Sequence, residues 1–265
     1  MHKAKTFIFI FALFFSSALF AQRLELGLTG GGASYLGDLN QYQPLKISGL
    51  SAGGFVKLNF NPRFALGVHY NYGQIEANDS KSENEQFRDR NLSFQTSLKE
   101  ISLMGELNLF DMHKQNARKF SPFLFVGIGN VFFQPTTVYD GVKYSLANYN
   151  TEGQEYSLNA VTILYGLGVK FRLTENLTLS NHIGYRTAFT DYIDDVSGNY
   201  SDTSAWGTTA DGVLRRALAD RSGEKTGVFL GVPGTQRGDY RKRDTYMFVG
   251  IGISYTFVSQ KCFTF

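Results

Sequence analysis

The stretch DTYMFVGIGISYTF, residues 244–257, alternates between two kinds of side chain. Successive residues of a β-strand point to opposite faces, so every second residue shares a face. One face of this stretch is apolar throughout, whereas the other becomes small or polar toward its end. A tilted strand of about ten residues crosses the hydrocarbon core of a bilayer. The apolar face consists of Met247, Val249, Ile251, Ile253, Tyr255 and Phe257.

The composition favours strands that meet lipid. Charged residues make up 18% of the 265 residues, whereas about a quarter is typical of soluble domains. The chain holds 24 Phe, 15 Tyr and 28 Gly, which suits strands that face lipid on one side and pack small residues on the other. No run of about twenty apolar residues follows residue 21, so we expect no transmembrane helix.

The N-terminal segment is typical of a secretory signal peptide. Lys3 and Lys5 precede an apolar run over residues 6–20, which is too short for a membrane anchor, and Ala21 suits cleavage. Cleavage there removes two lysines and takes the formal charge from +3 to +1, which gives no electrostatic reason to bind nucleic acid. We therefore expect a signal peptide at 1–21, a barrel at 22–257 and a periplasmic C-terminal tail at 258–265.

Seven further stretches read as strands, of which 120–134 carries large residues on both faces, and the connections between strands alternate in length. The short connections are 61–63, 111–119 and 174–176, and the long ones are 35–46, 78–91, 135–155 and 194–243. Short periplasmic turns and long extracellular loops are typical of outer-membrane barrels, which must close their backbone hydrogen bonds. The expected strands are 24–34, 47–60, 64–77, 92–110, 120–134, 156–173, 177–193 and 244–257.

The sequence thus predicts an all-β fold in the cell outer membrane. We expect an eight-stranded antiparallel transmembrane β-barrel, similar to OmpA and OmpX, with long extracellular loops and short periplasmic turns. Its interior should be just filled by side chains, so inward charges of opposite sign should pair and plug the lumen. The predicted lumenal charge cluster consists of Glu25, Lys57, Glu100, Glu106, Lys170, Arg172 and Arg186.

Two histidines, His69 and His182, are also expected inside the barrel. Ser180 shares a face with His182, which is the minimum for a lipid hydrolase based on Ser and His. No third orienting residue or nucleophile motif accompanies them, and a barrel interior needs polar residues in any case. We therefore expect no enzyme activity, catalytic residue, cofactor or small-molecule substrate.

An acidic run follows the seventh expected strand. Oxygen ligands of this kind can hold calcium, but the spacing does not match an EF-hand loop. A solvated acidic loop is the preferred interpretation, and no metal site is predicted. The run comprises Asp191, Asp194, Asp195 and Asp202.

Basic residues precede the last strand. Arg237, Gly238 and Asp239 spell a tripeptide known from adhesion ligands, but three residues arise easily by chance in such a loop. A basic cluster near the outer leaflet can contact lipopolysaccharide phosphates, and a solvated run of charges is the default interpretation. The cluster consists of Arg237, Arg241, Lys242 and Arg243.

The single cysteine, Cys262, lies in the expected periplasmic tail. It cannot form a disulfide within the chain, so the alternatives are a free thiol and a disulfide to a periplasmic partner.

Three stretches carry a resemblance to a known family. They are GGGASYLGDL at 30–39, TDYIDDVSGNY at 190–200, and the run from Arg237 to Tyr246, with Lys261 and Cys262 in the tail. In this order and spacing they resemble the PorG-like outer-membrane barrels of the type IX secretion system of Bacteroidota. The resemblance implies a non-enzymatic component that associates with the periplasmic ring of PorK and PorN and helps to anchor it.

The alternative function is that of an OmpX-like surface barrel, whose long loops serve adhesion or bind lipopolysaccharide. The expected partners are therefore outer-membrane lipid and lipopolysaccharide, together with PorK and PorN.

Overall fold

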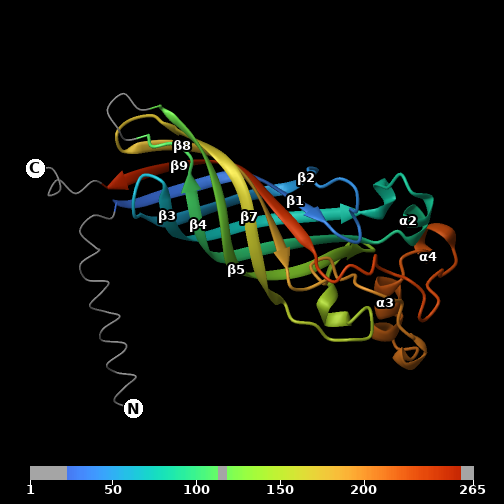
Figure 1. Ribbon diagram of the computed structural model, residues 1–265. Helices are drawn as coiled ribbons and strands as arrows, with labels where there is room; N and C mark the ends of the chain where they lie inside the picture. Colours follow the sequence, from blue (N-terminus) through green and yellow to red (C-terminus); the bar gives the residue numbers. More distant parts are fainter. Residues whose placement is uncertain (1–22, 113–117, 258–265) are drawn as a thin grey trace, which may run out of the picture.

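Eight long strands form one antiparallel sheet that closes on itself (Figure 1). The computed structural model describes residues 23–112 and 118–257, so the expected signal peptide and the tail with Cys262 lie outside the described residues. β1 begins and β9 ends at the end of the barrel opposite to the helices. The barrel strands are β1 (Arg23–Leu36), β2 (Ile47–Asn59), β3 (Phe64–Asn78), β4 (Ser93–Asn108), β5 (Phe120–Tyr139), β7 (Asn159–Arg172), β8 (Leu177–Ala188) and β9 (Thr245–Phe257).

The first and last strands close the barrel. β1 pairs with β9 in an unbroken register from Leu24 opposite Phe257 to Leu36 opposite Thr245. The other strands pair with their neighbours along the chain, and β4 pairs with β5. The predicted eight-stranded antiparallel barrel, with short turns at one end and long loops at the other, is thereby confirmed.

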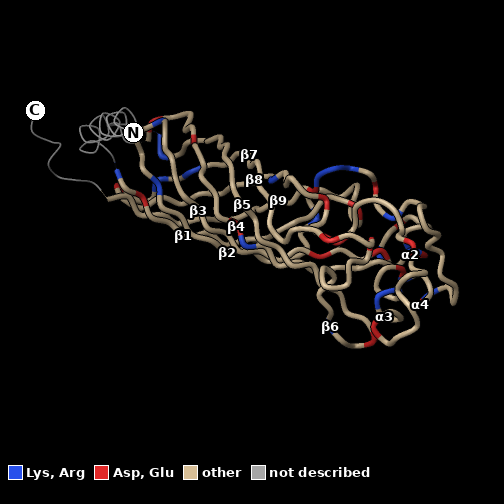
Figure 2. The backbone as a smooth tube through the Cα atoms, turned by 90° about the horizontal axis from the view of Figure 1, so that it is seen from below, with Lys and Arg blue, Asp and Glu red and all other residues tan. Residues whose placement is uncertain are grey.

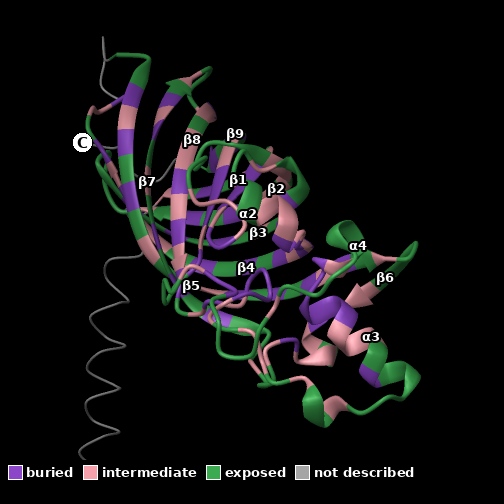
Figure 3. Ribbon diagram, turned by 90° about the vertical axis from the view of Figure 1, so that its right-hand side faces the viewer, coloured by how far each residue is buried: buried purple, intermediate pink, exposed green. Residues whose placement is uncertain are grey.

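Each strand turns one apolar face outward. In β3, Phe64, Leu66 and Val68 are between 39% and 54% exposed, whereas the alternating Ala65 is buried. Burial bands of this period run along the strands in Figure 3. An exposed apolar belt around a closed sheet is what a barrel in hydrocarbon requires, since water cannot reach its backbone groups.

Met247 is an exception to the predicted outward face, because it is only 2% exposed. It pairs across the sheet with Ser34 of β1. The Ser34 hydroxyl donates a hydrogen bond of 3.0 Å to the carbonyl oxygen of Pro44. The connection before β2 therefore folds over the outer face of β1 at this level.

Large and small residues alternate inside the barrel. The rings of Phe123 and Phe125 on β5 lie over glycines of β7 and β8. A Cβ atom at Gly168 would stand 2.5 Å from the Phe123 ring, and one at Gly184 would stand 2.6 Å from the Phe125 ring. These glycines are therefore required by close packing across the lumen.

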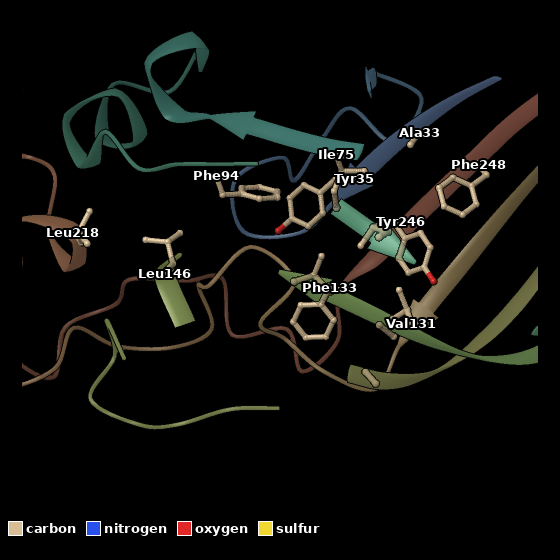
Figure 4. Packing of buried hydrophobic residues seen from close by; sticks show 14 residues of the cluster. Ala33, Tyr35, Ile75, Phe94, Val131, Phe133, Leu146, Leu218, Tyr246 and Phe248 are labelled. Atoms are coloured by element: carbon tan, nitrogen blue, oxygen red, sulfur yellow. The ribbon is translucent and has the colours of Figure 1, made fainter. Parts of the chain in front are cut away.

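The long loops fold into a cap over the end of the barrel away from Arg23. A buried apolar cluster joins strand residues such as Tyr246 to Leu218 in the loops (Figure 4), and Ile193 belongs to the same cluster. No helix in the described part of the chain is long and apolar enough to cross a membrane. The cap contains α2 (Glu85–Arg90), α3 (Ala210–Ala219), α4 (Gly223–Thr226) and the short 3-10 helices η1 (Asp79–Lys81), η2 (Leu146–Tyr149) and η3 (Ser204–Trp206).

The fifth strand is longer than expected. β5 continues to Tyr139 and turns back into a short β6 (Val142–Ser145). The turn between them is Asp140-Gly141, with both residues at positive φ of 47° and 74°. An Asp-Gly pair with this backbone is the type I′ turn of a two-residue hairpin. The connection predicted at 135–155 therefore begins with the end of β5 and a short hairpin.

Ile251 on β9 tests whether the apolar belt faces hydrocarbon. It is 59% exposed, and Ile251→Lys would place a charge in lipid, which destabilises a barrel by about 2–4 kcal/mol near the bilayer midplane. The matched control is Val228→Lys in the cap, where the original side chain is 63% exposed and the charge stays in water. Urea unfolding of the protein in vesicles measures both, and equal losses of stability would contradict a lipid-facing belt.

Candidate functional site

A series of ion pairs crosses the lumen near the end of the barrel where β1 begins. The Nζ atom of Lys57 on β2 lies 3.0 Å from Glu25 on β1 and 3.3 Å from Glu106 on β4. Glu106 also pairs with Lys170 on β7. All four side chains are buried. Glu106 thus links opposite walls of the barrel, with two acids balanced by two lysines.

A second polar cluster surrounds Glu100 on β4, which is fully buried. Its carboxylate lies 3.3 Å from the Nε atom of Arg186 on β8. It also accepts hydrogen bonds from Tyr246 Oη at 2.6 Å and from Asn71 Nδ2 at 3.2 Å. Four strands therefore meet on one carboxylate, and its charge is balanced by that of Arg186.

Aromatic rings fill the space beside these charges. The Lys57 ammonium lies 4.4 Å from the centroid of Phe55, and the Arg186 guanidinium lies 4.7 Å from that of Phe248. Arg172 is the one predicted lumenal charge that the described residues leave without an ion pair, and it is only half-buried. The other six predicted residues form the two clusters, which together with the rings plug the lumen.

The lumenal histidines do not form a nucleophile pair. His69 stacks on Phe55, with ring centroids 5.0 Å apart. The Ser180 hydroxyl donates to the carbonyl oxygen of Gly252 at 3.4 Å rather than to His182. The described residues therefore place no Ser–His hydrogen bond in the lumen, and the expectation that there is no catalytic residue stays a prediction.

Arg237 contacts several segments of the cap and is buried, with 2% of its surface exposed. Its Nη1 atom lies 2.9 Å from a Glu152 carboxylate oxygen and donates to the Asp195 carbonyl at 2.7 Å. Its Nε donates to the carbonyl of Ala219 at 3.1 Å, and its own carbonyl accepts from Arg90 at 2.5 Å. Burial disfavours the charge, but Glu152 and Asp195 outweigh it and raise the pKa of Arg237.

A group of carboxylates lies at the capped end of the barrel, where acidic residues gather in Figure 2. One oxygen each from Asp38, Asp191 and Asp244 lie within 4.8 Å of one another. Asp38 follows β1, Asp244 precedes β9, and Asp191 follows β8. Asp244 accepts the Ile193 N–H at 2.9 Å and the Tyr35 hydroxyl at 3.3 Å.

Burial and mutual repulsion shift the titration of these acids. Burial, followed by the charge of Asp194, raises the pKa of Asp38 to about 10. Burial, followed by the charges of Asp38 and Asp191, raises the pKa of Asp244 well above its usual range. Burial raises the pKa of Asp191 to about 6. Ionised carboxylates in this place therefore need a positive charge or a proton.

The expectation of a solvated acidic loop is wrong. Asp191, Asp194 and Asp195 are 9%, 1% and 0% exposed, and only Asp202 of the predicted run is exposed. Asp195 accepts hydrogen bonds from Thr151 and pairs with Arg237 instead of joining the group of three. The reason is the packed cap, which covers a segment that looks like a surface loop in the sequence.

The Arg-Gly-Asp tripeptide is not presented at the surface. Arg237 and Gly238 are buried, and the Asp239 side chain is 9% exposed and pairs with Arg241 at 3.2 Å. This geometry opposes adhesion through the tripeptide and removes Arg237 from the predicted basic cluster. The exposed members are Arg241, Lys242 and Arg243, and their contact with lipopolysaccharide stays a prediction.

The sequence interpretation missed Asp38 and Asp244 as members of one site. The signal was available, because closure of a barrel pairs its first and last strands. The residue after the first strand must then lie beside the residue before the last one. Asp38 and Asp244 hold these positions.

Comparisons with known proteins identify a family. A model of DUF6089, a domain of unknown function, matches residues 4–210. A search of curated proteins found no match. Among solved structures, the chain is similar to the outer membrane protein OprG from Pseudomonas aeruginosa, at 10% identity and a TM-score of 0.43, over 90% of this chain and 97% of that one.

Two further solved structures are similar to the chain. A major outer membrane protein from Thermus thermophilus shares 14% identity at a TM-score of 0.42, over 89% of this chain and all of that one. Ail, the attachment invasion locus protein of Yersinia pestis, shares 10% identity at a TM-score of 0.36, over 89% of this chain and 97% of that one. By its own strand pairing and apolar belt, the chain has the fold of an outer-membrane barrel.

Lys57 tests the lumenal network. Lys57→Met removes the shared cation and leaves Glu25 without an ion pair in the described lumen, and breaking a buried pair in this way costs about 3–5 kcal/mol. Arg172→Met is the control, because Arg172 is half-buried and unpaired among the described residues, and a change of less than about 1 kcal/mol is expected there. Equilibrium unfolding in detergent micelles measures both, and a small effect of Lys57→Met would refute the network's role in stability.

Proposed function

The chain belongs to the DUF6089 family, a domain of unknown function, and we propose that it is a non-conducting outer-membrane component of type IX secretion. It associates with the periplasmic ring of PorK and PorN and helps to anchor that ring to the membrane, as the PorG-like resemblance implies. The plugged lumen is the observation that carries the proposal. Glu106 and Glu100 each bind residues from opposite walls, so the barrel acts through its surfaces and not through its interior.

The three stretches that carry the resemblance support the proposal because they meet at one place. Tyr35 of the first stretch donates a hydrogen bond to Asp194 of the second. Asp38 of the first accepts the backbone N–H of Asp239 in the third, and Asp244 of the third accepts the N–H of Ile193 in the second. Segments far apart in the chain thus form one structural unit.

The end opposite the cap is the proposed contact surface. Its short turns expose Arg63 and Glu175. A cavity of about 240 Å³ opens among the strand ends and turns at this end, and residues such as Arg23, Pro62 and Met112 line it. β9 ends at Phe257 on the same side, and Cys262 follows it in the sequence, outside the described residues.

Charge-reversal variants at the two ends of the barrel test which end contacts the ring proteins. A tagged protein, extracted from cells in mild detergent, is expected to recover PorK and PorN. Arg63→Glu combined with Glu175→Lys should strongly reduce their recovery and the secretion of type IX cargo. The control, Lys225→Glu, changes a cap residue whose side chain is 43% exposed and should leave both unaltered. Unchanged recovery and secretion with the turn variant would reject this contact surface, and failure of the wild type to recover either protein would reject the partner.

Cys262 allows a second test of the periplasmic contact. A disulfide to a ring protein would give a band of higher mass on a non-reducing gel, and Cys262→Ser should abolish that band. The same pattern for wild type and variant would mean that the contact is not disulfide-linked.

A further inference from the structure

We propose that the cap binds one calcium ion between Asp38, Asp191 and Asp244, and that this ion joins the outer ends of the first and last strands. The three carboxylate oxygens lie within 4.8 Å of one another. Calcium binds oxygen ligands at about 2.3–2.6 Å, so two ligands of one ion lie up to about 5 Å apart. The spacing of the three oxygens therefore suits a single ion among them.

Two buried oxygens without partners point to a ligand independently of this spacing. Oδ2 of Asp38 and Oδ1 of Asp191 are shielded from solvent and accept no hydrogen bond in the described chain. Asp38 is 1% exposed and Asp191 is 9% exposed. An ionised carboxylate can only accept, so each such oxygen requires a donor or a cation. Buried polar atoms are otherwise almost always paired.

The surrounding charges leave the group of three without a protein cation. Two further acids, Asp194 and Asp239, face Asp38 and add negative charge. No Lys, Arg or His of the described residues forms an ion pair with Asp38, Asp191, Asp194 or Asp244, since the basic residues of the cap have other partners. Those pairs are Arg237 with Glu152 and Asp195, Arg90 with Asp79, and Arg241 with Asp239.

The ligand chemistry selects a hard divalent cation. The site offers only oxygen and neither imidazole nor thiolate, which disfavours zinc and copper. Magnesium demands a near-ideal octahedron with short bonds, whereas calcium accepts irregular sets of carboxylates from separate loops. Calcium sites of extracellular modules bind in the range of about 10⁻⁴–10⁻³ M, which suits a cap on the outer side of the barrel.

The ion would act on the closure of the barrel. Asp38 follows β1, Asp244 precedes β9, and Asp191 belongs to the segment that leaves β8. One ion would therefore hold three neighbouring strand ends and the cap that continues from them. This inference depends on the cap alone and is independent of the periplasmic partner proposed above.

Equilibrium dialysis with radioactive calcium tests the site in the full-length protein in detergent, after ions have been removed with EDTA. We expect about one calcium per chain, half-bound between about 10⁻⁵ and 10⁻³ M. Asp38→Asn and Asp191→Asn each keep the shape of the side chain but remove a charged ligand, so each should weaken binding about tenfold or more. Asp202→Asn is the control, because Asp202 is exposed and belongs to the same long loop.

Thermal unfolding of the same samples distinguishes a lost ligand from a damaged fold. In EDTA, Asp38→Asn should raise the melting temperature, because it relieves repulsion among unpaired acids. In calcium the wild type should have the higher melting temperature, because only the wild type gains stability from the ion. Absence of saturable calcium binding, equal affinity of both variants and the wild type, or equally tight binding of magnesium would each overturn the proposal. A lower melting temperature of Asp38→Asn in both conditions would also overturn it, unless Asp191→Asn shows the reversal.

Discussion

The structure depends on the hydrogen-bonded pairing of β1 with β9. In hydrocarbon every backbone N–H and C=O must find a partner within the protein, so a sheet cannot leave an open edge. The thirteen residue pairs from Leu24–Phe257 to Leu36–Thr245 remove that edge. Their register also fixes which side chains face lipid and which face the lumen, since a slip of one residue would exchange the two faces.

Closure creates an interior that eight strands can fill with side chains. Charges of opposite sign occupy it in balanced sets, with Glu106 and Glu100 at the centres of the two clusters. Removing one member of such a set leaves a buried charge unpaired. The members of each set therefore depend on one another. A barrel filled in this way presents its turns at one end and the folded cap at the other.

The barrel could be predicted from the sequence because its signals are local and periodic. Alternation in residues such as Phe64, Leu66 and Val68 gives both the strand and its outward face. Turn chemistry is also local, so the Asp140-Gly141 hairpin can be predicted from these two residues. The cap could not be predicted in the same way, because its burial arises from contacts between distant segments, such as Arg237 with Glu152. Acidic residues that look solvated in the sequence are buried by those contacts.

The filled lumen is tested most directly by ion conductance. Purified full-length protein is inserted into a planar lipid bilayer, and the current is recorded at constant voltage. If side chains plug the barrel, the current should stay at its baseline without stepwise openings. Insertion is verified separately by the resistance of the barrel to added protease. Stable steps of uniform size, proportional to voltage and growing in number with added protein, would show an open channel and contradict a barrel that works through its surfaces.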